Sequence, residues 1–326
     1  MPVGTPADSS VRGDRIPAGL EVLVEVPATS ANLGAGYDSF GMALDIRDAV
    51  RARITPAPID PEACVTVSGE GADVLPRSTA HLIHRVAREV LAARGLELGD
   101  RLELEARNVI PQSRGMGSSA SAVVAGIAIA DAIGQAAGCE PETAAGRLAW
   151  ATHFEGHPDN AAPALFGGVT ISFTDIGGAA QSVSVPVADG VRAVLIVPET
   201  RLDTAIARSL LPETVPHADA AANSAIAGLF AYAISHDPGM LLEATVDRLH
   251  QNYRRPAMLE SLERVDALRA AGLAAVVSGA GPTVAVLGTG DDLAERVAAV
   301  LRGDPARILA TAIAPVGVLT TVVDES

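Results

Sequence analysis

The chain has 326 residues, of which 48% are hydrophobic and 19% charged, and its formal net charge is −15 at pH 7. This composition is typical of a globular protein with one large or two medium domains. The acidic balance argues against a nucleic-acid partner, whose phosphates require a basic surface. All 24 basic residues are Arg. The absence of Lys excludes Schiff-base chemistry and a Walker A phosphate loop, because both need a Lys amine.

The N-terminus predicts a frayed tail over residues 1–19, because it holds no apolar stretch long enough for a secretory signal. We therefore expect a cytoplasmic protein. The most apolar segment, 120–130, is too short and too rich in small residues to span a bilayer, so it predicts a buried helix and no membrane partner. Cys64 and Cys139 have no His or Cys at metal-ligand spacing near them and are expected to be core thiols.

Alternating residues predict strands and helical spacing predicts helices along the whole chain. Strands are expected at 21–26, where Pro27 would end the strand, at 47–54, 64–69, 100–108, 167–173 and 191–198, twice within 274–288, and twice at the C-terminus. Helices are expected at 78–95, 118–138, 141–155, 203–211, 217–235, 238–250, 256–271 and 291–302. This interleaving lacks the strict βαβ order of a doubly wound sheet, so it predicts an α+β fold in two lobes.

The stretch 176–182 is rich in Gly and Ala and has the most linker-like composition inside the chain. We therefore place the domain boundary between residues 175 and 190. The predicted division is a flexible tail at 1–19, an N-terminal domain at 20–182 and a C-terminal domain at 183–326.

The segment 108–126, NVIPQSRGMGSSASAVVAG, sets an Arg and two Gly before a run of hydroxyls and then turns apolar. A Gly-rich loop at a helix N-terminus offers unpaired N–H groups and the positive end of the helix dipole, which predicts an anion site. The open alternative is that the serines merely cap an Ala-rich helix.

Two familiar Gly motifs fit this segment poorly. A Rossmann fingerprint requires its first Gly directly after a strand, but about eight residues separate the alternating segment 101–107 from Gly115. No acidic residue ends a second strand roughly twenty positions later. A serine-hydrolase elbow is excluded because no Ser has Gly both two positions before and two positions after it.

Two further Gly-rich loops lie at 27–44, PATSANLGAGYDSFGMAL, and at 277–284, VSGAGPTV. Together with 111–121 they resemble, in order and spacing, the three signatures of the GHMP kinases, which comprise galactokinase, homoserine kinase, mevalonate kinase and phosphomevalonate kinase. The first loop and the segments 155–169 and 203–212 are similar to homoserine kinase in particular. The resemblance extends over nearly all of the chain beyond the tail.

The resemblance implies a two-lobed GHMP-kinase fold with an N-terminal ATP-binding α+β domain and a C-terminal ferredoxin-like α+β domain. ATP and substrate would bind in the cleft between the lobes. The implied reaction is ATP-dependent phosphorylation of the side-chain hydroxyl of L-homoserine, which gives O-phospho-L-homoserine in threonine biosynthesis. A homodimer is the expectation for the family.

By the same resemblance, one loop would hold the ATP phosphates. Its residues are Pro111, Gln112, Ser113, Arg114, Gly115, Met116, Gly117, Ser118, Ser119, Ala120 and Ser121. Ser119 and Glu155 would hold Mg²⁺, a hard cation that takes few protein oxygens and shares the rest with phosphate and water.

Homoserine carries an ammonium, a carboxylate and the reacting hydroxyl, so its site needs an acid, guanidinium groups and neutral hydrogen-bonding groups. Asp38 matches the family position that pairs with the ammonium, and Arg208 and Arg254 match those that bind the carboxylate, for which the planar guanidinium is suited. Asn32, His157 and Asn160 match positions on the hydroxyl side. The residues expected to take part in catalysis are Asn160, Asp159 and Arg254.

The catalytic base is the least determined part. Some relatives use an Asp–Lys pair, which this chain lacks, and Asp159 is the alternative acceptor. We favour a reaction without a dedicated base, in which the phosphate takes the proton. The spacing from Glu155 to Asp159 is shorter than in several relatives, and His81 stands where many have Asn near the adenine. Arg254 is preferred to Arg255 because it follows Tyr253.

Two other functions stay open at this point. One is a GHMP-type kinase for another small hydroxyl compound, such as mevalonate, shikimate or a sugar. Asp38 with two arginines favours an amino acid over these. The other is an inactive relative that binds a metabolite as a sensor, against which the intact Ser119 and Glu155 argue.

Overall fold

The computed structural model describes residues 15–323. Residues 1–14 of the expected tail lie outside this range. Ile16 is 3% exposed and belongs to the first core cluster, so the packed part of the chain begins before residue 20, where the sequence-based boundary was set.

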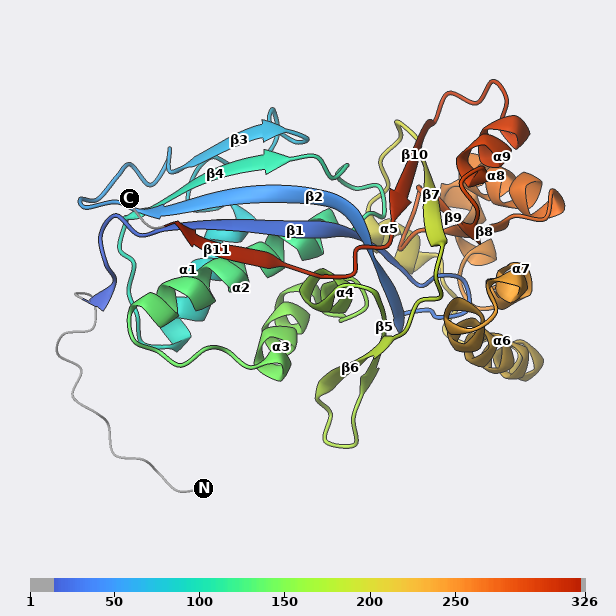
Figure 1. Ribbon diagram of the computed structural model, residues 1–326, viewed down its shortest axis with the longest axis horizontal. Coiled ribbons are helices and arrows are strands. Elements are labelled where there is room, and N and C mark those ends of the chain that lie inside the picture. The colour runs from blue at the N-terminus through green and yellow to red at the C-terminus, as the bar shows by residue number, and fades with distance from the viewer. Residues whose placement is uncertain (1–14, 324–326) are drawn as a thin grey trace.

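The first lobe is built on a seven-stranded sheet with the order β11-β1-β2-β4-β3, to which β5 and β6 are added beside β2. The strands are β1 (Glu21–Ala31), β2 (Phe40–Ile54), β3 (Val65–Gly69), β4 (Leu102–Asn108), β5 (Val169–Thr174), β6 (Ala180–Val185) and β11 (Leu319–Val323). Four helices lie along one face of this sheet (Figure 1): α1 (Leu82–Ala93), α2 (Ser118–Ala136), α3 (Ala144–Glu155) and α4 (Ala161–Phe166).

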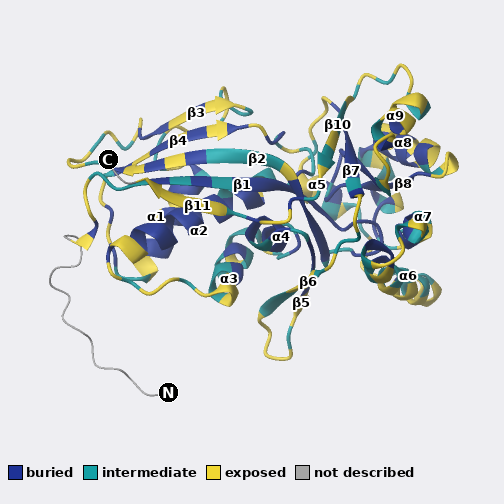
Figure 2. Cartoon of the chain, viewed as in Figure 1, coloured by how far each residue is buried: buried dark blue, intermediate teal, exposed yellow. Residues whose placement is uncertain are grey.

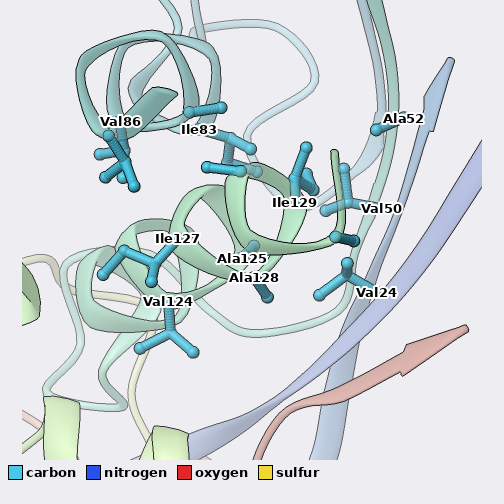
Figure 3. Packing of buried hydrophobic residues seen from close by; sticks show 14 of the residues in the cluster. Val24, Val50, Ala52, Ile83, Val86, Val124, Ala125, Ile127, Ala128 and Ile129 are labelled. Atoms are coloured by element: carbon cyan, nitrogen blue, oxygen red, sulfur yellow. The ribbon is translucent and has the colours of Figure 1, made fainter. Parts of the chain in front are cut away.

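Residues alternate between buried and exposed along β4, because one face of the sheet packs on the helices and the other faces solvent (Figure 2). The central helix α2 lies between α1 and the sheet, with Ile127 and Ile129 among the buried side chains of this core (Figure 3). Among the described helices, α2 is long and apolar enough to cross a membrane, but 78% of its most apolar window is buried inside the protein. It is therefore the core helix that the sequence predicted.

The strand β1 is longer than the sequence indicated. Pro27 does not end it, and the pairing of β1 with β2 continues to Ala31 across a register shift between Pro27 and Ala28. Proline is tolerated in a strand at such an irregularity because no regular ladder bond is lost there. This extension carries Thr29 and Ser30, both fully buried, to the edge of the second lobe.

The second lobe contains a four-stranded antiparallel sheet with the order β10-β7-β9-β8. Its strands are β7 (Val191–Val197), β8 (Ala274–Val277), β9 (Val284–Thr289) and β10 (Arg307–Ala312). Its helices are α5 (Thr204–Ser209), α6 (His217–Ser235), α7 (Leu241–Ala244), α8 (Leu259–Ala270) and α9 (Leu293–Val300), with short 3₁₀ segments at η2 (Pro238–Met240) and η3 (Asn252–Ala257). Chain order and strand order together give the ferredoxin-like βαββαβ arrangement that the family resemblance implied.

The expected domain boundary and linker need correction. The stretch 176–182 is not a linker but the turn and first residues of a β5–β6 hairpin, in which Asp175 accepts hydrogen bonds from the N–H groups of Gly177 and Ala179. Beyond the second sheet, β11 returns to the first lobe and pairs with β1. The chain therefore crosses between the lobes twice, and residues 183–185 and 319–323 belong to the first sheet.

Candidate active site

Three loops that are far apart in the sequence meet between the lobes. The N–H of Thr29 donates to the Met116 carbonyl at 3.0 Å, and the N–H of Gly279 donates to the Ala31 carbonyl at 3.0 Å. The Ser278 hydroxyl hydrogen-bonds to the Gly115 carbonyl, with 2.6 Å between the oxygens. The Gly-rich loops that resemble the kinase signatures thus form one connected wall.

This wall borders a cavity of about 740 Å³. Its volume is in the range of pockets that hold small ligands. The lining includes Asn32, residues 113–120, Glu155, His157, Asp159, Asn160, Arg201, Arg208, Arg254 and Gly279. The structure therefore brings almost every predicted site residue to one place, and Asp38 is held there through Arg208.

The helix α2 begins at this wall without a side-chain cap. Its N-cap residue is Gly117, and no side chain accepts from the first turn. The Ser119 hydroxyl instead donates to Glu155 Oε1 at 2.6 Å, and the buried Ser121 hydroxyl donates to the Pro27 carbonyl at 2.8 Å. The alternative that these serines merely cap the helix is wrong, and the uncapped N-terminus keeps its N–H groups and dipole available for an anion.

Two glycines allow this close approach of the loops. Gly115 has φ 72°, and a Cβ there would lie 2.1 Å from the Ser278 carbonyl oxygen. Gly117 has φ 70°, and a Cβ there would lie 1.9 Å from Thr29 Oγ1. Neither position has room for a side chain, and both conformations favour glycine.

The predicted phosphate loop divides between two cavities. Residues 113–120 line the large one, Met116 with its side chain in the core, while Gln112 and Ser121 line a smaller neighbour of about 340 Å³. Pro111 is buried and lines neither of these two cavities. The Arg114 guanidinium donates to the carbonyls of Gln112, Pro198 and Glu199 at 2.9, 2.9 and 2.7 Å. Its side chain thereby ties the loop to the second lobe.

The smaller cavity shares Ser113, Ser118 and Ser119 with the large one and is lined mainly by apolar groups. His81 also lines it. The His81 side chain is 4% exposed, and its Nδ1 atom has no hydrogen-bond partner among the described residues. Burial lowers the pKa of His81, which favours the neutral form of the ring.

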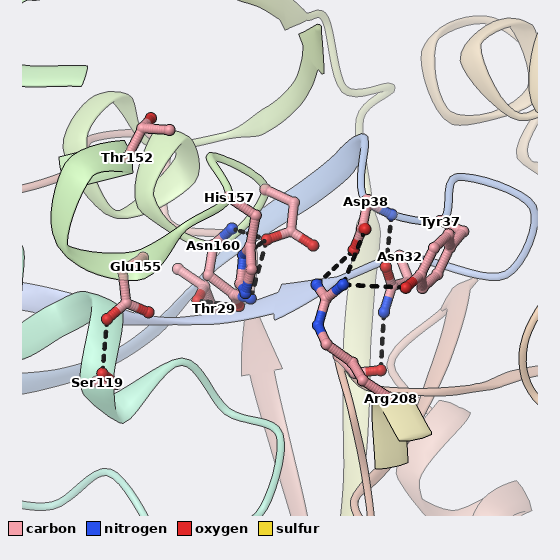
Figure 4. A network of polar contacts seen from close by, with 12 residues as sticks. Thr29, Asn32, Tyr37, Asp38, Ser119, Thr152, Glu155, His157, Asn160 and Arg208 are labelled. Carbon is pink, nitrogen blue, oxygen red and sulfur yellow. Dashed lines mark hydrogen bonds and ion pairs between the residues drawn. The ribbon is translucent and has the colours of Figure 1, made fainter. Parts of the chain in front are cut away.

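Glu155 and Ser119 stand at one end of the polar network in Figure 4. Burial raises the pKa of Glu155, and the hydrogen bond from Ser119 lowers it in part. Among the described residues, no group of three His, Cys, Asp or Glu side chains is placed to hold a metal ion. Ser119 and Glu155 thus supply two oxygens, a donor set that suits a cation sharing its remaining positions with phosphate and water.

The middle of the network holds the groups expected on the hydroxyl side. His157 Nδ1 lies 2.6 Å from Asp159 Oδ1, and this hydrogen bond raises the pKa of His157. Asp159 is 2% exposed, and its Oδ1 also accepts from the backbone N–H of Asn160 at 2.8 Å. The Thr29 hydroxyl donates to Asn160 Oδ1 at 2.8 Å, which fixes the side-chain amide.

Asp38 lies beside Arg208, toward the other end of the network (Figure 4). It has φ 53°, an uncommon conformation for a residue other than Gly, and its N–H donates to Asn32 Oδ1 at 2.9 Å. The Asn32 amide donates in turn to the Gly279 carbonyl at 2.8 Å. Burial acts to lower the pKa of Arg208. The hydrogen bond to Asp38 and the negative charge of Asp38 outweigh this effect, so the pKa of Arg208 is raised.

Arg254 is the most deeply buried cation of the site, with 1% of its surface exposed. Its Nη1 donates to the Gly279 carbonyl at 3.2 Å and to His250 Nδ1 at 3.3 Å, but its Nε has no partner among the described residues, and no described carboxylate lies within ion-pair distance. A buried charge without a counter-ion is unfavourable. Arg254 is therefore suited to receive an anionic group from a ligand in the cavity.

Sequence reasoning assigned no role to several residues that the structure places here: Thr29, Tyr37, His250 and Ser278. Thr29, Tyr37 and Ser278 stand inside the Gly-rich loops already singled out, so those loops carried the signal. His250 is four positions before Arg254, a spacing that brings two side chains together on one turn of helix-like chain.

Comparison with known proteins agrees with this arrangement. Residues 81–168 match the GHMP kinases N terminal domain, and residues 229–305 match the GHMP kinases C terminal domain. The fold and the three loops are those of a GHMP kinase.

The similarity is also specific within that class. The chain is 45% identical to a homoserine kinase from Streptomyces avermitilis, over 82% of this chain and 85% of the relative, and 46% identical to one from Clavibacter michiganensis, over 83% and 84%. A crystal structure of homoserine kinase from Cytophaga hutchinsonii shares the fold, with a TM-score of 0.78 at 23% identity over 92% of this chain and 97% of that one. The chain belongs to the homoserine kinase family.

Proposed function

We propose that this protein transfers the γ-phosphoryl group of ATP to the side-chain hydroxyl of L-homoserine. The support is one cavity with an uncapped helix N-terminus at one end. At the other end stand Arg208, its partner Asp38, and Arg254, which is buried and has no carboxylate partner among the described residues. The first end suits a chain of phosphates and the second suits an amino-acid zwitterion.

For the nucleotide, the phosphates would lie against residues 113–120. The adjoining cavity of about 340 Å³ is lined mainly by apolar groups and would take the base, because it opens beside Ser118 and Ser119. The N-terminal half of α2 then serves both parts of ATP, the phosphates through backbone N–H groups and the base through apolar contact.

The donor set of Ser119 and Glu155 fits Mg²⁺, and we propose that these two residues hold it. Bound there, Mg²⁺ would neutralise negative charge on the ATP phosphates. The protein's own contribution at this end is to hold the two oxygens 2.6 Å apart and to present them beside the first turn of α2.

For the acceptor, Asp38 would pair with the ammonium, Arg208 and Arg254 with the carboxylate, and Asn32, His157 and Asn160 would line the side of the hydroxyl. In the reaction the hydroxyl oxygen forms a bond to the γ-phosphorus, and the bond from that phosphorus to the bridging oxygen of ADP breaks. The hydroxyl proton passes to the transferred phosphoryl group. Phosphoryl transfer needs mainly positioning and charge neutralisation, which these residues supply.

The test is ADP release from Mg²⁺-ATP in the presence of homoserine, threonine, mevalonate, shikimate or galactose, with the product identified by ³¹P NMR. We expect stimulation by homoserine well above the rate without an acceptor, and O-phosphohomoserine as the product. Stimulation by another acceptor and not by homoserine would contradict the substrate. No stimulation by any acceptor would favour a metabolite sensor.

The setting of the reaction remains a prediction. We expect it in the cytoplasm, where ATP is abundant, and we expect a homodimer. Cell fractionation and light scattering on the purified protein would test these two points.

A further inference from the structure

Tyr37 lies between the two arginines of the acceptor end. The Arg208 guanidinium carbon lies 5.8 Å from the centre of the Tyr37 ring, and that of Arg254 lies 5.5 Å from it. Arg208 Nη1 also donates to the Tyr37 hydroxyl at 3.1 Å. Figure 4 shows Tyr37 beside Asp38 and Arg208. One aromatic side chain therefore contacts both of the cations that the carboxylate of the acceptor would meet.

Arg208 and Arg254 both bring a positive charge to the one Tyr37 ring. Burial lowers the pKa of Arg254 most, and the positive charge of Arg208 lowers it further. Arg254 has no carboxylate partner among the described residues. The face of an aromatic ring is electron-rich and attracts cations, so the Tyr37 ring offsets part of the repulsion between Arg208 and Arg254 without neutralising either of them. An acidic side chain at position 37 would instead form ion pairs with the arginines and so compete with a ligand carboxylate.

His250 contacts both Tyr37 and Arg254. Its Nε2 lies 3.0 Å from the Gly34 carbonyl oxygen, which only accepts hydrogen bonds, so Nε2 carries the hydrogen and Nδ1 is left to accept from Arg254. Burial lowers the pKa of His250, in agreement with a neutral ring. The Tyr37 and His250 rings are 5.2 Å apart between centres. Tyr37 and Arg254 therefore both rest on one fixed imidazole.

We propose that Tyr37 is a positioning residue for the acceptor carboxylate, because its ring face holds Arg208 and Arg254 in the orientation that binds two oxygens. This inference rests on the proposed function. The role belongs to acceptor binding and not to phosphoryl transfer, since Tyr37 contacts the arginines and not the groups on the hydroxyl side. Loss of the ring weakens homoserine binding equally in the ground state and in the transition state.

The test compares Tyr37→Phe, which keeps the ring and loses the hydroxyl, with Tyr37→Leu, which loses both. For Tyr37→Leu we expect the KM for homoserine to rise about tenfold, as cation–π contacts of this kind allow, with kcat and the KM for ATP nearly unchanged. For Tyr37→Phe we expect a rise of less than about threefold, because the ring contacts remain. Tyr37→Met is a second ringless variant in case Tyr37→Leu folds poorly.

Tyr232→Leu is the matched control. Tyr232 also stacks on a histidine, His236, with 5.1 Å between ring centres, but it is 52% exposed and does not line the cavity. Its substitution should leave all kinetic constants unchanged. A Tyr37→Phe variant as impaired as Tyr37→Leu, or ringless variants that lose kcat at an unchanged KM, would overturn the inference. If the unmodified protein does not phosphorylate homoserine, the proposed function fails first. If it does and the ringless variants keep its KM, this inference alone fails.

Discussion

The Arg208 guanidinium and the Asp38 carboxylate form a two-point ion pair, with 2.7 Å from Nη2 to Oδ1 and 3.0 Å from Nη1 to Oδ2. The pair joins α5 of the second lobe to the loop after β1 of the first. In the proposed complex, Asp38 serves the ammonium of homoserine and Arg208 its carboxylate. The substrate therefore replaces this pair by two new ones, and each protein group exchanges one opposite charge for another.

We expect Arg208→Lys to raise the KM for homoserine about tenfold or more, because an ammonium keeps the charge but loses the planar fork that binds two oxygens. The KM for ATP should stay the same. Steady-state kinetics with each substrate varied in turn measures both values. Arg248→Lys is the control, since Arg248 is half-exposed and lies 4.0 Å from Asp219. An unchanged KM for homoserine would remove Arg208 from the acceptor site.

The contact between Gly117 and Thr29 gives a second prediction. We expect Gly117→Ala to raise the KM for ATP strongly and to lower the melting temperature, because the new Cβ would meet Thr29 Oγ1 at 1.9 Å. Gly138→Ala is the control, because it introduces backbone strain without a clash. Gly138 has φ 84° beyond the other end of the same helix, with open space around it, so its substitution should cost stability of about 1 kcal/mol without affecting ATP. Equal effects of the two variants on the KM for ATP would argue against the phosphate site.

Glu155→Gln tests the proposed magnesium site. Gln retains an oxygen that can accept from Ser119, so we expect an unchanged melting temperature, while kcat falls about 100-fold or more and the Mg²⁺ concentration needed for half-maximal rate rises. Titration of Mg²⁺ at fixed ATP provides the measurement. Glu97→Gln, on the exposed surface, is the control. A Glu155→Gln variant with normal Mg²⁺ dependence would place the metal elsewhere.

Asp159→Asn tests whether the reaction needs a dedicated base. Asn keeps an oxygen that can accept from His157 and from the Asn160 N–H, so we expect folding and appreciable turnover to persist. Single-turnover kinetics with saturating substrates gives the rate of the chemical step. A loss of about 10⁴-fold, the upper end of general-base contributions, would show that Asp159 takes the proton.

His84 in α1 predicts a pH dependence of stability. The side chain is 1% exposed, and burial, with a smaller effect of Arg88, lowers its pKa to about 4. Between pH 6.5 and 4 the unfolded chain therefore binds a proton that the folded protein does not, so stability contributed by neutral His84 is lost as the pH falls through this window. Asp48 has the opposite effect on stability. Burial raises its pKa to about 6, so as the pH falls the folded protein binds this proton before the unfolded chain does.

We therefore compare His84→Leu with the unmodified protein at each pH. The melting temperature of His84→Leu, relative to the unmodified protein, should be higher at pH 4.5 than at pH 7. His153→Leu, a substitution at the exposed end of α3, serves as the control and should show no such trend. A constant difference between His84→Leu and the unmodified protein across this range would show that His84 does not titrate with unfolding.

Much of the architecture could be predicted from the sequence because its signals are local. The apolar period of 118–138 and the alternation of 100–108 predicted α2 and β4 to within two residues at each end. The continuation of β1 past Pro27 was missed because a bulge against β2 accommodates the proline, and this depends on a partner strand. The hairpin of β5 and β6 was missed because a Gly-rich turn and a linker have the same composition.

In the candidate site, too, the features with a local sequence signal could be predicted and those that depend on distant partners could not. The Gly-rich loops and the polar residues within them could be recognised from their order, and the structure brings them together. The pairing of Arg208 with Asp38 and the support of Arg254 by His250 depend on contacts between segments far apart in the chain. No local pattern encodes such contacts. Tyr37 was missed for a related reason, since one aromatic residue in a loop is informative only when its neighbours in space are known.

The return of β11 to the first sheet makes the second lobe an insertion held at both of its ends. A single cut by a protease in either link, 186–190 or 313–318, would leave the lobes covalently joined through the other. The same two links, of five and six residues, limit how far the lobes can separate, because a short chain spans only a short distance.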